Sequence, residues 1–145
     1  MTSSTHPACN IAAYGPGFYE LARAVVDKGT TFAVERDLRF AVAVVDHTFS
    51  VVALGRMDGT YPSCVGSATA KAQTAVNFGL PTDAVKDRTP LDIRIGLAGS
   101  DGRLIFVGGG VPIIVDGLVV GGVGVSGGSE DEDIAGAASA IAGIG

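Results

Sequence analysis

The feature that most constrains the fold is a glycine-rich apolar stretch from Gly108 to Gly128, GGGVPIIVDGLVVGGVGVSGG. Two β-branched runs, residues 111–115 and 118–125, flank the pair Asp116-Gly117. An Asp-Gly pair between such runs is typical of a type I′ turn, in which both central residues take a positive φ. The stretch therefore predicts a β-hairpin. Its opening glycines predict either a bend or a place where a ligand or a second chain approaches the backbone.

The composition fits one domain that packs mostly with small side chains. The chain has 145 residues, of which 47% are hydrophobic and only 17% are charged, and it contains 22 glycines. A length in this range is ordinary for a single domain. We expect a flexible arm over residues 1–13, which lack periodicity, and a single domain over residues 14–145. A surface with so few charges also favours a homo-oligomer.

The charge pattern argues against several classes of partner. The net charge is −5, and Lys and Arg form no cluster, so neither a nucleic acid nor a membrane surface is expected to bind. No apolar run without turn signals approaches the roughly 20 residues that span a bilayer. The N-terminus has no basic and apolar leader, so we expect a cytoplasmic protein. The two cysteines form no CxxC pair, and we expect neither a disulfide nor a metal site.

Residue periodicity predicts the elements that precede the hairpin. Apolar residues at intervals of three and four predict one long helix over residues 18–35, with a weak point at Gly29. Short β-branched runs predict buried strands at residues 40–45 and 51–54, joined by a turn at residues 46–50.

Local patterns also predict the elements that follow the second strand and the hairpin. The alanine-rich segment at residues 61–78 predicts a helix with a face of small residues. Residues 84–100 alternate in charge and predict a solvated segment, and residues 104–107 predict a further strand. Ser129 precedes four acidic residues, which is typical of a capped helix N-terminus.

Three charged residues lie inside otherwise apolar blocks. Arg56 and Asp58 follow the second predicted strand, where Arg56 would either bind a carboxylate or form a structural ion pair. Lys71 lies in the alanine-rich helix, three residues before Thr74 on the same helical face. A lysine at such a position either extends to solvent or binds an anionic ligand.

Other polar residues carry two interpretations each. His47 lies in the first turn, as an exposed turn residue or a catalytic imidazole, while Asp46 is expected to accept hydrogen bonds from turn amides. Cys64, near a helix N-terminus, is either an activated thiolate or a small buried thiol.

Four blocks of the sequence resemble one known family. They are AVAVVD at residues 41–46, VVALGRMDG at 51–59, AKAQTAVNFGLPT at 70–82 and the glycine-rich stretch at 108–128. In this order they resemble the GlcG/HbpS-like family, which includes haem-binding and haem-degrading proteins and the C-terminal domain of PduO-type proteins. The resemblance covers roughly residues 15–143 and makes haem a candidate cofactor, although it assigns no haem ligand.

The resemblance also implies an architecture. It implies an α/β fold with a central antiparallel sheet of about five strands and flanking helices, similar to profilin-like or PAS-like folds. Family members are typically oligomers built from dimers, so a homo-oligomer is implied again. Functions in the family are diverse, and the fold therefore carries over better than the activity.

The first functional hypothesis is a small-molecule-binding protein whose pocket holds an anionic ligand, such as haem or a small organic acid. Arg56 and Lys71 would hold the anionic group, and Asp58 would orient Arg56. The remaining expected ligand-binding residues are Thr74, Phe78, Gly109, Gly110 and Val111.

The second hypothesis is a cofactor-free enzyme. It would be an isomerase, lyase or cyclase acting on a small acidic or aromatic metabolite, possibly within a biosynthetic pathway. Asp58 and Lys71 are the candidate catalytic residues, because a buried lysine can act as a base when its pKa is lowered. Further acid–base candidates are His47, Tyr61 and Cys64. A structural subunit without a ligand is a third alternative.

Overall fold

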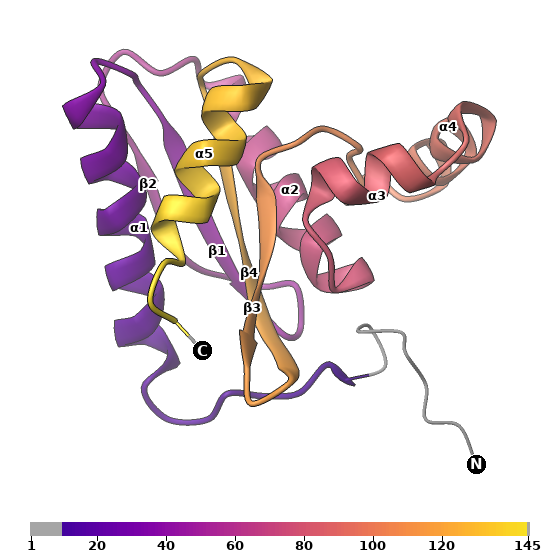
Figure 1. Cartoon of the computed structure of the whole chain (residues 1–145), viewed down its shortest axis with the longest axis horizontal. Coiled ribbons are helices and arrows are strands. Elements are labelled where there is room, and N and C mark those ends of the chain that lie inside the picture. Colours follow the sequence, from indigo (N-terminus) through magenta and orange to yellow (C-terminus); the bar gives the residue numbers. More distant parts are fainter. Residues whose placement is uncertain (1–9, 145) are drawn as a thin grey trace.

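The chain forms a four-stranded antiparallel sheet with helices on both faces (Figure 1). The computed structural model describes residues 10–144. The sheet order is β2-β1-β4-β3. The elements are α1 (Phe18–Glu35), β1 (Ala41–Asp46), β2 (Val51–Arg56), α2 (Ser63–Phe78), α3 (Thr82–Arg88), α4 (Leu91–Ser100), β3 (Gly110–Val115), β4 (Leu118–Ser126) and α5 (Glu130–Ala140). The predicted α/β class with a central antiparallel sheet is confirmed.

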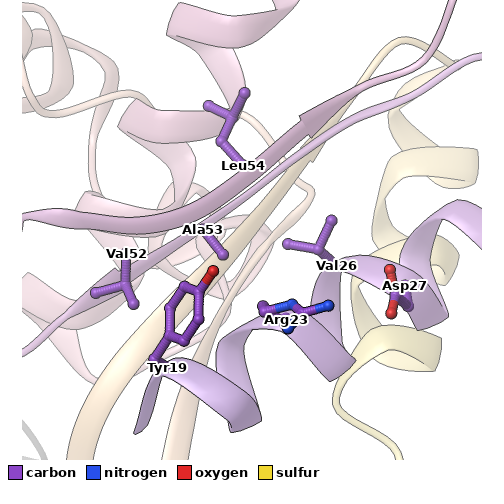
Figure 2. Close-up of a pocket in the computed structure, with 7 residues that line it drawn as sticks. All are labelled: Tyr19, Arg23, Val26, Asp27, Val52, Ala53 and Leu54. Atoms are coloured by element: carbon purple, nitrogen blue, oxygen red, sulfur yellow. The ribbon is translucent and has the colours of Figure 1, made fainter.

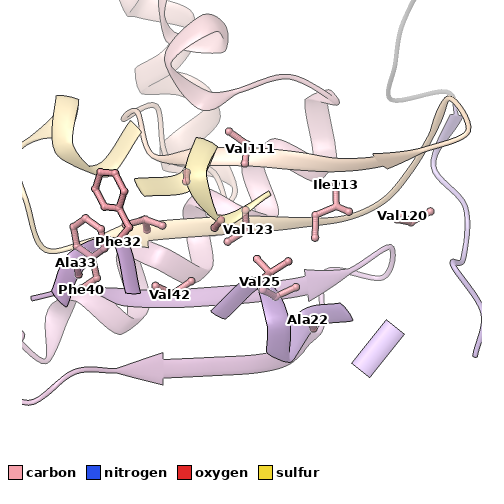
Figure 3. Packing of buried hydrophobic residues seen from close by; sticks show 14 of the residues in the cluster. Ala22, Val25, Phe32, Ala33, Phe40, Val42, Val111, Ile113, Val120 and Val123 are labelled. Carbon is pink, nitrogen blue, oxygen red and sulfur yellow. The ribbon is translucent and has the colours of Figure 1, made fainter. Parts of the chain in front are cut away.

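The main core lies between the sheet and the pair α1 and α5 (Figure 3). Successive strand residues point to opposite faces, so Val42 and Val44 of β1 enter this core, whereas Ala41 and Ala43 face α2. Other side chains of this core are Phe18, Val25, Phe32, Phe40, Ile113, Val123 and Val125. The helix at residues 18–35 forms with its predicted bounds.

Gly29, the predicted weak point of this one long helix, does not interrupt α1. The helix continues through it, and a Cβ on Gly29 would lie 3.0 Å from Cγ2 of Val42. The glycine is therefore a contact point where the helix lies close to β1.

The opposite face of the sheet carries α2 at unusually close range. A Cβ on Gly124 would collide with the carbonyl oxygen of Ala68, and one on Gly122 would lie 2.6 Å from the carbonyl oxygen of Ala72. A Cβ on Gly110 would collide with the carbonyl oxygen of Lys71. The glycines of the hairpin thus admit the backbone of α2 of the same chain, where the sequence predicted a bend or the approach of a ligand or a second chain.

The predicted hairpin is confirmed at β3 and β4. Asp116 has φ 53° and Gly117 has φ 78°, so both central residues of the turn take positive φ, as a type I′ turn requires.

The strand predicted at residues 104–107 does not form, so the sheet has four strands and not about five. Thr74 forms hydrogen bonds with the backbone of this segment. Its hydroxyl donates to the carbonyl of Arg103 and accepts from the N–H of Ile105. Phe106 is buried, with its ring 6.2 Å from that of Phe78. The segment is therefore fastened to α2 instead of pairing with a strand.

The segment predicted as solvated at residues 84–100 is mostly exposed and forms the end of α3 and all of α4. Pro81 and Pro90 precede them, a position that suits a helix start. No residue of α4 is buried, and this helix stands away from the sheet (Figure 1).

The end of the predicted arm is held on the sheet. Ile11 forms a parallel bridge with Val119, and the N–H of Ala12 donates to the carbonyl of Val119. Residues 1–9, with His6 and Cys9, lie outside the described residues, so the division into arm and domain stays a prediction. Within residues 10–144, no helix combines the length and hydropathy needed to cross a membrane.

Candidate functional site

Of the three blocks that were predicted to form one pocket, the structure separates the one with Arg56 and Asp58 from the other two. Arg56 and Asp58 are exposed at the end of β2, and no ion pair joins them within the described part of the chain. β1 and β4 lie between β2 and β3, so Arg56 is about 14 Å from the strand that carries Val111, at a strand spacing of about 4.8 Å.

Lys71 belongs to a buried ion pair. Its Nζ lies 3.0 Å from Oδ2 of Asp133 and donates a 2.9 Å hydrogen bond to the carbonyl of Val125. The other carboxylate oxygen of Asp133 accepts the N–H of Gly128. Burial raises the pKa of Asp133, against the opposing attraction of the Lys71 ammonium. The pair joins α2, β4 and α5, and the catalytic roles of Lys71 and Asp58 stay predictions.

The other predicted ligand contacts are also engaged within the chain. Thr74 is fully buried and holds the 103–105 segment, and Phe78 packs on Phe106. The N–H of Gly110 donates to the hydroxyl of Thr82 at 2.9 Å. Gly109 lies beside Lys71, so the structure brings together Lys71, Gly109 and Gly110 as parts of the core.

Glu130 fixes the start of the glycine-rich stretch. Its Oε2 accepts the N–H of Gly108 at 2.7 Å and pairs with Lys86 at 2.6 Å. The Lys86 ammonium, followed by the Gly108 N–H, holds the pKa of Glu130 below its ordinary value of 4.5.

This shift predicts an acid-sensitive contribution to stability. A carboxyl with a lowered folded-state pKa stabilises the protein fully above its unfolded pKa and loses that contribution as the pH falls through the folded pKa. Glu130→Gln should therefore cost stability at neutral pH and progressively less below about pH 4.5. Urea unfolding of both proteins across this range measures the difference, and a cost that does not change with pH contradicts the assignment.

A cavity of about 240 Å³ lies where the chain enters α1, against the β1–β2 turn. It combines an imidazole, a carboxylate and two aromatic side chains. Its lining residues are Ala13, Tyr14, Gly15, Phe18, Asp46, His47 and Val120. We call it the His47 cavity.

Local hydrogen bonds fix the conformation of the turn that carries His47. Oδ1 of Asp46 accepts the N–H of Thr48 at 2.8 Å, the hydroxyl of Thr48 at 2.6 Å and the N–H of Ser50 at 3.3 Å. The prediction that Asp46 binds turn amides is confirmed. Burial raises the pKa of Asp46, but these hydrogen bonds together outweigh it and lower the pKa. A fixed negative charge thus lies beside the half-buried His47.

The aromatic wall of this cavity was not predicted. Tyr14 and Phe18, whose ring centroids lie 5.9 Å apart, were not among the predicted site residues. Gly121 makes room for Phe18, because a Cβ there would lie 2.7 Å from its ring. The only sequence signal was the i, i+4 spacing of two aromatic residues where a helix begins.

The remaining enzyme candidates lie elsewhere. Tyr61 is 77% exposed before α2, whereas Cys64 is buried against Ala41, Ala43 and Ala68. The structure therefore favours the buried-thiol interpretation of Cys64. No cluster of three or more metal-ligating side chains occurs among residues 10–144.

A larger groove of about 380 Å³ runs between α1 and the edge strand β2 (Figure 2). Tyr19, Arg23 and Asp27 follow one another along α1 on one side of it, and Val52, Ala53 and Leu54 line it from β2, with Val26 from the helix between them. We call it the α1–β2 groove. It contains none of the predicted site residues.

Comparison with known proteins defines the class. Residues 19–142 match the family described as "Haem degrading protein HbpS-like". The chain belongs to this family, and the predicted resemblance is confirmed.

Individual relatives agree with this assignment. The chain is 31% identical to protein GlcG of Escherichia coli K12 over 115 residues, which cover 74% of this chain and 78% of GlcG. It superposes on a double mutant of Streptomyces reticuli HbpS with a TM-score of 0.80 and 29% identity, covering 100% of this chain and 91% of that one. It also superposes on a complex of PduOC with haem, with a TM-score of 0.75 and 29% identity, covering 93% and 98% of the two chains.

Proposed function

We propose that this protein binds haem, with His47 as the side chain that contacts the iron. The observation that carries the proposal is the half-buried imidazole of His47 facing a cavity with two aromatic side chains. The haem complex of PduOC, a similar structure, supports the choice of ligand.

The residues present fit haem in chemistry and in part of its size. Histidine is a frequent ligand of haem iron and tyrosine a less common one, and Phe18 and Val120 give the cavity an apolar wall. Its volume of about 240 Å³ is below the roughly 300–1,000 Å³ of most small-molecule sites. The cavity therefore admits one part of the ligand, and the remainder would lie on the adjacent surface.

Each residue then has a defined task. Asp46 fixes the turn that carries His47 through Thr48 and keeps a negative charge beside the imidazole. Tyr14 and Phe18 exclude water from one side of the cavity. Bound haem would supply a redox-active iron.

Titration with haemin, followed by absorbance near the Soret band, tests the proposal. His47→Ala should weaken binding by at least about tenfold and shift the band, because the axial nitrogen is lost. His6→Ala is the matched control, since it removes the other histidine of the chain. Unchanged affinity and an unchanged spectrum in His47→Ala contradict the proposal.

The same titration tests the anion-binding role predicted for Arg56. Because Arg56 lies far from the His47 cavity along the sheet, Arg56→Ala should leave haemin affinity unchanged if haem binds at His47. A loss of affinity in Arg56→Ala, with none in His47→Ala, would favour the site predicted at the end of β2.

One observation favours acid–base catalysis as a second function. The carboxylate of Asp46 and the imidazole of His47 line the same cavity, and Tyr14 adds a phenol. A purified protein that is colourless and fails to bind haemin would move the assignment to a cofactor-free reaction at this cavity.

A further inference from the structure

The α1–β2 groove is large enough for a small molecule and has a mixed lining. Its volume of about 380 Å³ lies within the roughly 300–1,000 Å³ of most small-molecule sites, whereas the His47 cavity lies below that range. Tyr19, Arg23 and Asp27 follow one another at intervals of four residues, so they share one face of α1. The hydroxyl of Tyr19 points toward β2 across the groove (Figure 2). The groove therefore combines polar groups on the helix with an apolar strand.

The two charged residues of the groove lie close together without pairing. Arg23 and Asp27 are one helical turn apart, and among residues 10–144 neither forms an ion pair. Their order contributes to this, because a helix favours the acid N-terminal to the base and here the base comes first. The guanidinium of Arg23 lies instead over the ring of Tyr19, 5.8 Å from its centroid. Within this range, the donors of Arg23 and the acceptors of Asp27 therefore remain available to a ligand.

The strand side of the groove offers further hydrogen-bonding groups. The N–H of Met57 donates to the carbonyl of Phe40, which fixes the alternation of the β1–β2 ladder. Gly55 therefore directs its main-chain groups toward β1, and Leu54 directs its N–H and carbonyl away from the sheet. β2 is an edge strand, and no other strand in the described part of the chain takes up these groups. One donor and one acceptor thus lie at the rim of the groove.

These features fit a small zwitterion with an apolar body. Side chains one helical turn apart have Cβ atoms about 5–6 Å apart, so a ligand that contacts Arg23 and Asp27 together needs opposite charges on neighbouring atoms. A free α-amino acid meets this condition, because its ammonium and carboxylate share one carbon, whereas the charged ends of a peptide lie further apart. The planar guanidinium suits the carboxylate, and the apolar lining of Val26, Val52 and Ala53 suits an apolar side chain.

We propose that the α1–β2 groove binds a free α-amino acid with an apolar side chain. The ligand carboxylate pairs with Arg23, and the ligand ammonium pairs with Asp27. The ligand side chain packs on Val26 and on the ring of Tyr19. The outward N–H and carbonyl of Leu54 add a donor for the carboxylate and an acceptor for the ammonium. The proposal is independent of haem binding.

Titration of the full chain with leucine and with phenylalanine, followed by NMR of the backbone amides, tests the proposal. We expect saturable shifts at Ala53 and Leu54, with a dissociation constant below about 10 mM. N-acetyl-leucine lacks the ammonium, leucine amide lacks the carboxylate and glycine lacks the apolar side chain, so each should bind about threefold to tenfold more weakly. If neither amino acid binds up to about 10 mM, or if the two leucine analogues bind as well as leucine, the proposal is overturned.

Matched substitutions assign the two charged contacts. Arg23→Gln should weaken leucine binding by about threefold to tenfold and remove the difference between leucine and leucine amide. Asp27→Asn should weaken it similarly and remove the difference between leucine and N-acetyl-leucine. Arg88→Gln and Asp87→Asn make the same changes on the exposed surface of α3, outside the groove, and should have no effect. Wild-type affinity and selectivity in either groove variant overturn the proposal.

Discussion

Replacing Lys71 with methionine is expected to destabilise the protein by about 3–5 kcal/mol, because it leaves the buried carboxylate of Asp133 without its partner. The side chains of Lys71 and Asp133 are only 3% and 5% exposed, so solvent cannot replace the lost charge. Urea unfolding at fixed protein concentration measures the change as a shift of the midpoint at a constant slope.

Two controls identify the cause of that loss. Lys71→Met/Asp133→Leu removes both charges and should cost clearly less than the sum of the single changes. Lys86→Met breaks an ion pair whose side chains are 29% and 38% exposed, and should cost no more than about 1 kcal/mol. If the Lys71 and Lys86 variants were equally stable, burial would not be what makes the Lys71 pair important.

Gly124→Ala is expected to destabilise the protein by more than about 3 kcal/mol, beyond the usual range for overpacking, because the obstacle is backbone. The added Cβ would collide with the carbonyl oxygen of Ala68, and α2 cannot move away without leaving β1 and β3 as well. Thermal and urea unfolding of the variant measure this loss.

Gly66→Ala is the matched control on the helix that Gly124 contacts. A Cβ on Gly66 meets no atom within 4 Å, and its exposed position lies inside α2. The substitution should therefore stabilise the protein by about 0.5–1 kcal/mol through helix propensity. If Gly124→Ala were as well tolerated as Gly66→Ala, the close packing of α2 on β4 would be wrong.

Much of the fold could be predicted because its signals are local. The Asp116-Gly117 turn has the type I′ conformation that an Asp-Gly pair between β-branched runs predicts. Ser129 caps α5 and forms a capping box with Glu132, as its place before four acidic residues indicated. The strand predicted at residues 104–107 does not form. Thr74, some 30 positions earlier in the chain, forms hydrogen bonds with the carbonyl of Arg103 and the N–H of Ile105 instead.

The candidate site depended on contacts that no local pattern contains. Lys71 and Asp133 are 62 positions apart, on helices that cover opposite faces of the sheet, and only the tertiary structure brings their side chains together as an ion pair. His47 was a candidate from its turn, but its cavity needed Tyr14 and Phe18 to reach it from the start of α1.

The sequence by itself determined the family, the antiparallel hairpin and the capped final helix, because family blocks, turn residues and caps act over a few neighbouring positions. The tertiary structure alone decided what the glycines of residues 108–128 are for. Whether a missing Cβ admits a ligand, a second chain or α2 depends on which backbone lies above the sheet, and here that backbone is α2. It also decided that β2 and β3 are the edge strands, because an edge is defined by the order of strands in space.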